Sequence, residues 1–208
     1  MSSSRRQFLQ SAAAAGALSS LSLPIFGAEA ATRPLRLLIL GGTGFIGPHE
    51  INHALERGHK ITMFNRGKTA PDMFPNVERL IGDRNGQLDS LKGREWDAVI
   101  DNSGFFPRHA RLSAELLKGN VGQYLFVSSI SAYGQELAVD HDEFTAPPAQ
   151  MPGPVDESEY IYGPTYGARK RLCEEAVSKV FGDDAILVRP GIITGPGDPT
   201  NRLRHWLV

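Results

Sequence analysis

The sequence is poor in cysteine and has no excess of charge of either sign. Cys173 is its one cysteine, which excludes an internal disulfide and a cysteine-rich zinc cluster. The formal net charge is −1, from 22 basic and 23 acidic residues, and this balance argues against a protein that holds nucleic acid through phosphate contacts. His141 and Asp142 are adjacent, but two residues are too few for a metal site. We therefore expect no metal and no nucleic acid as ligands.

Residues 1–30 have the layout of an export signal. Arg5 and Arg6 lie in a Ser-Arg-Arg-x-Phe-Leu run, a short apolar stretch covers 11–26, and residues 28–30 read Ala-Glu-Ala. A basic start, a short apolar middle and a small-residue exit are typical of secretory signals. The run resembles the twin-arginine signal, which directs folded proteins to its translocon. We expect export to the periplasm by that route, with anchoring to the membrane by an uncleaved signal as the alternative.

The remaining chain, 31–208, alternates between strand-like and helix-like runs. With 208 residues, 41% of them hydrophobic, the sequence is long and apolar enough for one domain with a core. Such alternation predicts βαβ units, and hence an α/β fold with a Rossmann-like, doubly wound parallel sheet and helices on both faces. The strand-like runs are 36–40, 60–64, 77–81, 98–100, 124–127 and 185–188, and the clearest helices are 110–117 and 166–180.

A glycine-rich loop follows the first apolar run. Residues 41–47 read Gly-Gly-Thr-Gly-Phe-Ile-Gly, and apolar residues then recur at helical spacing as far as Gly58. Strand, glycine loop and helix in this order are typical of dinucleotide binding, because the backbone can approach a pyrophosphate at the helix N-terminus. The predicted cofactor contacts in this loop are Gly41, Thr43, Gly44, Phe45, Ile46 and Gly47.

The second strand lacks the acidic residue that usually ends it in dinucleotide folds. Asn65, Arg66 and Lys68 stand there instead. A carboxylate would repel a 2′-phosphate, whereas these cations would attract one. We predict contacts from all three residues and NADP as the preferred cofactor, with NAD as the alternative.

Two groups of side chains suggest proton transfer. Ser128 and Ser129 end a predicted strand, and Tyr166 precedes Lys170 by four residues. On a helix this spacing puts both side chains on one face. A lysine beside a phenol lowers the phenol pKa, and such a tyrosine can exchange the proton that accompanies hydride transfer. Taken alone, however, such pairs also occur by chance on helix surfaces.

Together these motifs resemble those of the extended short-chain dehydrogenase/reductases, in the NAD(P)-dependent epimerase/dehydratase group. The resemblance extends over about residues 35–208. The motifs that carry it are Gly41–Gly47, Gly82-Asp83, Phe126-Val127-Ser128-Ser129, Tyr133-Gly134, Tyr166 with Lys170, and Arg189-Pro190-Gly191.

The resemblance implies roles for individual residues. Ser129 would be the catalytic serine, Tyr166 the general acid/base, and Lys170 would hold the nicotinamide ribose and tune Tyr166. Asp83 would contact the adenine amino group. Further cofactor contacts are expected at strand ends, from Arg84, Asn102 and Ser103.

One departure from the group's pattern narrows the reaction. Dehydratases of the group carry a Thr-Asp-Glu run where this sequence reads Ser129-Ile130-Ser131. Without that acid and base, water elimination is not expected. Hydride transfer at a carbonyl or sugar hydroxyl carbon remains, as reduction or epimerisation, and Arg66 favours a reductase with exchangeable NADP. The expected partner is a small molecule, such as a sugar derivative, and a homodimer is left open.

A non-catalytic reading of the same fold is the alternative. The chloroplast stem-loop RNA-binding branch of the group has a similar Arg-Gly turn after its second strand, so a dinucleotide-binding or RNA-interacting module also fits. The export signal and the balanced charge weigh against RNA.

The last part of the chain raises two further expectations. The acidic, proline-rich stretch 135–159 separates Ser129 from Tyr166, and it fits an active-site lid or a plain surface loop equally. The chain stops at Val208 soon after 196–202, where relatives continue over the substrate. We expect a C-terminally truncated chain from which most of the substrate-binding part is absent.

Overall fold

The computed structural model describes residues 33–134, 138–158, 160–200 and 202. The expected export signal at 1–30 lies outside these residues. None of the helices in this described part has the length and apolar character needed to cross a membrane.

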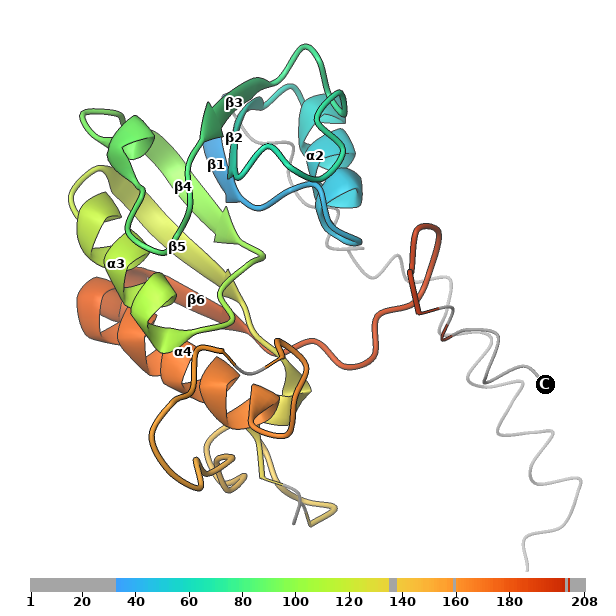
Figure 1. Ribbon diagram of the computed structural model, residues 1–208, viewed down its shortest axis with the longest axis vertical. Coiled ribbons are helices and arrows are strands. Elements are labelled where there is room, and N and C mark those ends of the chain that lie inside the picture. The colour runs from blue at the N-terminus through green and yellow to red at the C-terminus, as the bar shows by residue number, and fades with distance from the viewer. Residues whose placement is uncertain (1–32, 135–137, 159, 201, 203–208) are drawn as a thin grey trace, which may run out of the picture. The chain divides into compact units, whose positions relative to one another are not determined.

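Six parallel strands form one sheet in the order β3-β2-β1-β4-β5-β6 (Figure 1). This arrangement confirms the predicted Rossmann-like fold. Because the chain winds outward from β1 in one direction and then in the other, a crevice forms beyond the carboxyl ends of β1 and β4. The strands are β1 (Arg36–Leu40), β2 (Lys60–Asn65), β3 (Glu78–Ile81), β4 (Trp96–Asp101), β5 (Val121–Val127) and β6 (Ala185–Val188).

Helices cover both faces of the sheet. Helix α2 (Gly47–Glu56) lies on one side, and α3 (Pro107–Leu117) and α4 (Tyr166–Phe181) lie on the other (Figure 1). Short 3-10 turns complete the fold, namely η1 (Asp89–Leu91), η2 (Ile130–Ala132) and η3 (Gly182–Asp184). The doubly wound arrangement predicted from the alternation of strands and helices is therefore confirmed.

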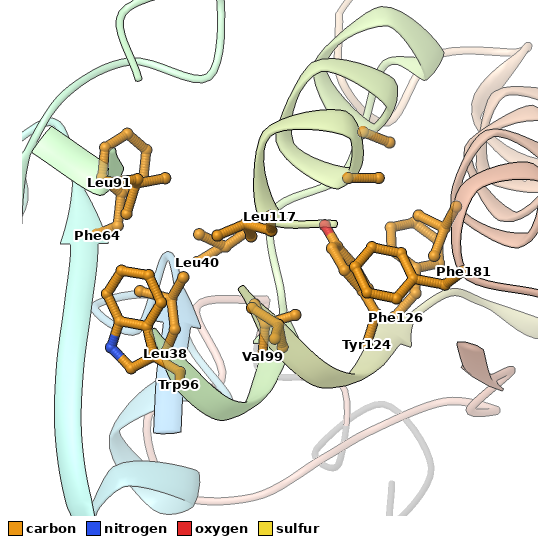
Figure 2. Close-up of a cluster of buried hydrophobic side chains, with 14 of the residues drawn as sticks. Leu38, Leu40, Phe64, Leu91, Trp96, Val99, Leu117, Tyr124, Phe126 and Phe181 are labelled. Carbon is orange, nitrogen blue, oxygen red and sulfur yellow. The ribbon is translucent and has the colours of Figure 1, made fainter. Parts of the chain in front are cut away.

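Strand β1 shows how the two cores are divided. Leu37 and Ile39 pack with Ile51 of α2, whereas Leu38 and Leu40 point to the opposite core. Successive side chains of a strand alternate between faces, and a strand covered on both sides therefore reads as an unbroken apolar run. Figure 2 shows the larger core, in which Leu117 of α3 and Phe181 of α4 pack with Phe126 and Tyr124 of β5.

Candidate functional site

A cavity of about 300 Å³ opens at the carboxyl ends of the strands. Its lining brings together residues that the sequence predicts as cofactor contacts from four separate segments. These are Gly41, Thr43, Gly44, Asn65, Arg66, Lys68, Asp83, Arg84 and Ser103. The other predicted contacts, Phe45, Ile46, Gly47, Asn102 and Lys170, are not among its lining residues.

Glycine is required in the loop between β1 and α2. Gly41 and Gly42 have φ values of +109° and +87°, which side chains with a Cβ rarely adopt. A Cβ on Gly47 would lie 2.5 Å from the backbone of Gly42, so the start of α2 can approach β1 only without one. A Cβ on Gly44 would meet no atom within 4 Å. The loop is thus tightly packed where Gly47 meets Gly42, and it leaves free space at Gly44, which lines the cavity.

The end of β2 supports this loop and presents cations. The side-chain amide of Asn65 donates to the carbonyl of Gly41 at 3.2 Å, and its oxygen accepts from the backbone N–H of Gly67 at 2.9 Å. Arg66 and Lys68 are exposed and line the cavity. Asp83 is the one carboxylate among the described lining residues.

A buried polar network lies beneath the cavity. Arg84 makes two 2.6 Å contacts with the carboxylate of Asp101 and donates to the hydroxyl of Ser113 at 3.2 Å. Tyr124 donates to the same carboxylate at 2.7 Å. Because the guanidinium of Arg84 is engaged in this bidentate pair, we expect it to shape the wall of the cavity.

Asn102 and Glu50 form a second polar contact at the ends of β4 and α2. The amide of Asn102 donates to Glu50 at 2.5 Å, and burial raises the pKa of Glu50 against the opposing effect of this hydrogen bond. The side-chain oxygen of Asn102 and the hydroxyl of Ser128 are buried, and neither has a hydrogen-bond partner within the described residues. Buried polar atoms of this kind are usually satisfied, so each is a candidate for a ligand contact.

Ser129 and Tyr166 meet, although 36 positions separate them in the sequence. The hydroxyl of Ser129 lies close enough to the phenol of Tyr166, the first residue of α4, to act against the rise in the pKa of that phenol. The close approach depends on Gly167, because a Cβ there would lie 2.0 Å from the carbonyl oxygen of Ser131 in η2. The pairing of this serine with this tyrosine is therefore built into the contact between α4 and η2.

Lys170 lies near this pair but its ammonium points elsewhere. Its Nζ donates to the carbonyls of Gly104 at 2.9 Å and Val127 at 2.6 Å, and burial lowers its pKa to about 8. Burial raises the pKa of Tyr166, and the nearby hydroxyl of Ser129 only partly opposes this rise. The expected lowering of the phenol pKa by Lys170 is therefore wrong for this arrangement, because desolvation has the largest effect.

Aromatic and apolar residues of the cavity were missed by sequence reasoning. Phe105, Phe106 and His109 come from the start of α3, and Ile161 comes from the segment before α4. Burial lowers the pKa of His109, so its imidazole is neutral near pH 7. A Phe-Phe-Pro run, beginning four residues after the end of β4, was the available signal.

Comparisons with known proteins agree with the fold. No family model matches the chain. It is 25% identical over 185 residues to a 3-beta-hydroxysteroid dehydrogenase of Mycolicibacterium neoaurum, and 26% identical over 162 residues to a chloroplast stem-loop binding protein of 41 kDa from Arabidopsis thaliana. These matches cover 79% and 62% of the chain. They cover 49% and 43% of the relatives, so the chain spans about half their length.

Among solved structures, the chain is similar to the Bordetella bronchiseptica enzyme WbmG, whose structure contains NAD. The TM-score is 0.63 at 18% identity, with 85% of this chain and 60% of that chain covered. At this identity the similarity establishes only the fold. The NAD in that structure is bound to WbmG. The chain therefore shares the Rossmann-like fold of this NAD-containing structure.

Proposed function

We propose that the protein is an NAD(P)-dependent oxidoreductase of the extended short-chain dehydrogenase type, acting at a carbonyl or alcohol carbon of a small molecule. The observation that carries the proposal is that Ser129, just after β5, and Tyr166, at the start of α4, lie close together at the sheet edge that also holds the glycine-lined cavity. The dehydrogenase relative and the NAD-containing structural neighbour support it.

The residues present fit a dinucleotide. The open space at Gly44 admits a phosphate close to the backbone, and α2 begins directly after the loop, with its N–H groups directed toward it. Arg66 and Lys68 supply positive charge to the wall of the cavity after β2. When bound, the cofactor supplies or accepts a hydride.

The protein's own part in the reaction is to hold an oxygen and to move a proton. Because its pKa is raised, the phenol of Tyr166 is protonated at neutral pH and can donate its proton to a substrate oxygen. The hydroxyl of Ser129, which lies close to the phenol, can hold the same oxygen by a hydrogen bond. Lys170 ties the ends of β4 and β5 together through Gly104 and Val127. Reduction of a carbonyl needs a proton donor at the substrate oxygen, whereas oxidation of an alcohol needs a base there. The protonated phenol of Tyr166 therefore suits carbonyl reduction.

NADP is the proposed cofactor, because Arg66 and Lys68 line the cavity where a 2′-phosphate would lie. The test compares the affinities of Arg66→Ala and the wild type for NADP and NAD. We expect the preference for NADP to fall in the variant, and an unchanged ratio of the two affinities would overturn the assignment. Epimerisation of a sugar derivative is the alternative reaction.

Titration of NADPH against the whole chain, followed by its fluorescence, tests the main proposal. Gly47→Ala forces a Cβ against the backbone of Gly42 and should weaken binding more than about tenfold, or 1.4 kcal/mol. Gly153→Ala is the matched control, because a Cβ there meets no atom within 4 Å. Failure of the well-folded wild-type protein to bind any pyridine nucleotide would overturn the proposal.

Tyr166→Phe separates an enzyme from a binding module. In an enzyme it should abolish oxidation of NADPH by carbonyl probes while leaving the affinity for NADPH unchanged. The second candidate function, RNA interaction on the same fold, is favoured by the stem-loop binding relative. Under that alternative a labelled RNA stem-loop should bind to the protein. Tyr166→Phe should then change neither the binding of the RNA nor the affinity for NADPH.

A further inference from the structure

A buried arginine that the proposed chemistry does not use lies in the first turn of α4, the turn that carries Tyr166. Arg169 is completely buried, three residues after Tyr166 on α4. Its Nε donates to the hydroxyl of Thr165 at 3.0 Å, and its Nη2 donates to the carbonyls of Tyr160 at 3.0 Å and Ile161 at 2.9 Å. The guanidinium therefore fastens the segment Tyr160–Tyr162, which we call the strap, to α4.

The same guanidinium also touches the wall of the cavity. Its central carbon lies 4.8 Å from the ring centroid of Phe106, the residue that precedes α3. Both Phe106 and Ile161 line the cavity. Arg169 thus contacts two lining residues from segments more than 50 positions apart.

The strap reaches the reacting end of the site as well. The ring of Tyr162 lies 5.5 Å from the ring of Tyr166 and 5.9 Å from that of Phe105, measured between centroids. One three-residue segment therefore supplies both a wall for the cofactor, through Ile161, and an aromatic neighbour for the proposed proton donor.

Hydrophobic burial alone does not hold the strap. The side chains of Tyr160 and Tyr162 are 72% and 62% exposed, so these rings gain little from removal from water. On the outside, Arg108 and Glu157 form an ion pair, but partly exposed pairs contribute little to stability. The buried fork of Arg169, with several donors in fixed geometry, is the specific attachment.

We propose that Arg169 is a positioning residue of the cofactor site, which sets the strap as the outer wall of the cavity and thereby joins cofactor binding to the surroundings of Tyr166. The inference rests on the proposed function, because it takes the cavity to be the nicotinamide dinucleotide site.

Arg169→Met tests the proposal, with Arg171→Met as its matched control. Arg171 lies on the same helix and also donates to a backbone carbonyl of the preceding segment, that of Ala149 at 2.8 Å, but Ala149, unlike Ile161, does not line the cavity. We expect the Kd for NADPH, measured by fluorescence, to rise about tenfold in Arg169→Met. It should stay unchanged in Arg171→Met.

Hydrogen exchange gives a readout that a purely structural role would not change. In the wild type, NADPH should slow exchange of the backbone amides around 160–162, and in Arg169→Met saturating NADPH should leave that exchange unchanged. Arg169→Lys should not restore the slowing, because an ammonium cannot reproduce the planar fork.

Three outcomes decide the question. If Arg169→Met binds NADPH as tightly as Arg171→Met does, the inference is overturned while the proposed function stands. If the wild type binds no NADPH, the proposed function is itself overturned. If Arg169→Met does not fold, Thr165→Val becomes the deciding variant, because it removes one partner of the guanidinium. A rise of about threefold in its Kd supports the inference, and an unchanged Kd overturns it.

Discussion

Lys170 shows what residue spacing can and cannot predict. Helical periodicity placed it close to Tyr166 on α4, one turn further along. Its hydrogen-bond partners, the carbonyls of Gly104 and Val127, belong to segments that only the folded sheet brings together. No local pattern could reveal them, and the burial that raises the pKa of Tyr166 is likewise a property of the folded chain.

The buried position of Lys170 predicts a pH dependence of stability. Its pKa falls from 10.5 to about 8 on folding. Between these values the unfolded chain binds a proton that the folded chain does not, so this group makes the free energy of unfolding rise with pH. The difference between the two pKa values corresponds to a change of about 3 kcal/mol in the free energy of unfolding across this pH range. We therefore expect the free energy of unfolding of the wild type, relative to Lys170→Met, to increase from pH 8 to pH 10.5.

Chemical denaturation at a series of pH values measures this difference. Lys179→Met, on the exposed side of the same helix, is the control and should give a profile parallel to that of the wild type. Parallel profiles for Lys170→Met as well would contradict the prediction.

At the scale of elements, apolar runs located the six strands and the two clearest helices to within three residues of their ends. The run 36–40 is β1 itself, because a strand covered on both faces is apolar throughout. Helix α3 begins at Pro107, three residues before the predicted start. Proline suits the first turn of a helix, where its missing N–H is not needed, and a search for apolar spacing alone passes over it.

The contact between α4 and η2 leads to a prediction about Gly167. Alanine at this position would place its Cβ 2.0 Å from the carbonyl oxygen of Ser131, so the start of α4 must move away. Because Tyr166 is the adjacent residue, its phenol should move away from the hydroxyl of Ser129. We expect Gly167→Ala to reduce NADPH-dependent turnover at least about tenfold, since proton transfer requires hydrogen-bond contact.

Its affinity for NADPH should change much less, because Gly167 does not line the cavity. Kinetics with carbonyl probes, together with fluorescence titration, separate the two effects. Full turnover in a folded Gly167→Ala protein would show that the contact between α4 and η2 does not position the phenol.

At the scale of the whole molecule, the fold class followed from the alternation of strands and helices. Strand order is a separate matter, because each crossover can return to either side of the sheet, and the sequence does not record which. The order β3-β2-β1-β4-β5-β6 sets the ends of β1 and β4 beside each other. The buried pair of Arg84 and Asp101 depends on this meeting of separate segments, and the sequence alone did not predict it.

The export route expected from residues 1–30 would connect that segment to the fold that follows it. A translocon that accepts folded proteins suits a chain whose cofactor site is assembled from distant segments, because those segments must meet before transport. Replacing Arg5 and Arg6 together by lysine keeps the basic charge but removes the arginine pair. We therefore expect this variant to remain in the cytoplasmic fraction of a host with an active twin-arginine translocon.

Gly47→Ala, which disturbs the glycine loop, should also be retained if loading with cofactor precedes export, whereas Gly153→Ala should be exported. Immunoblots of cytoplasmic and periplasmic fractions measure all three variants, and periplasmic accumulation of the twin-lysine protein would contradict the proposed route.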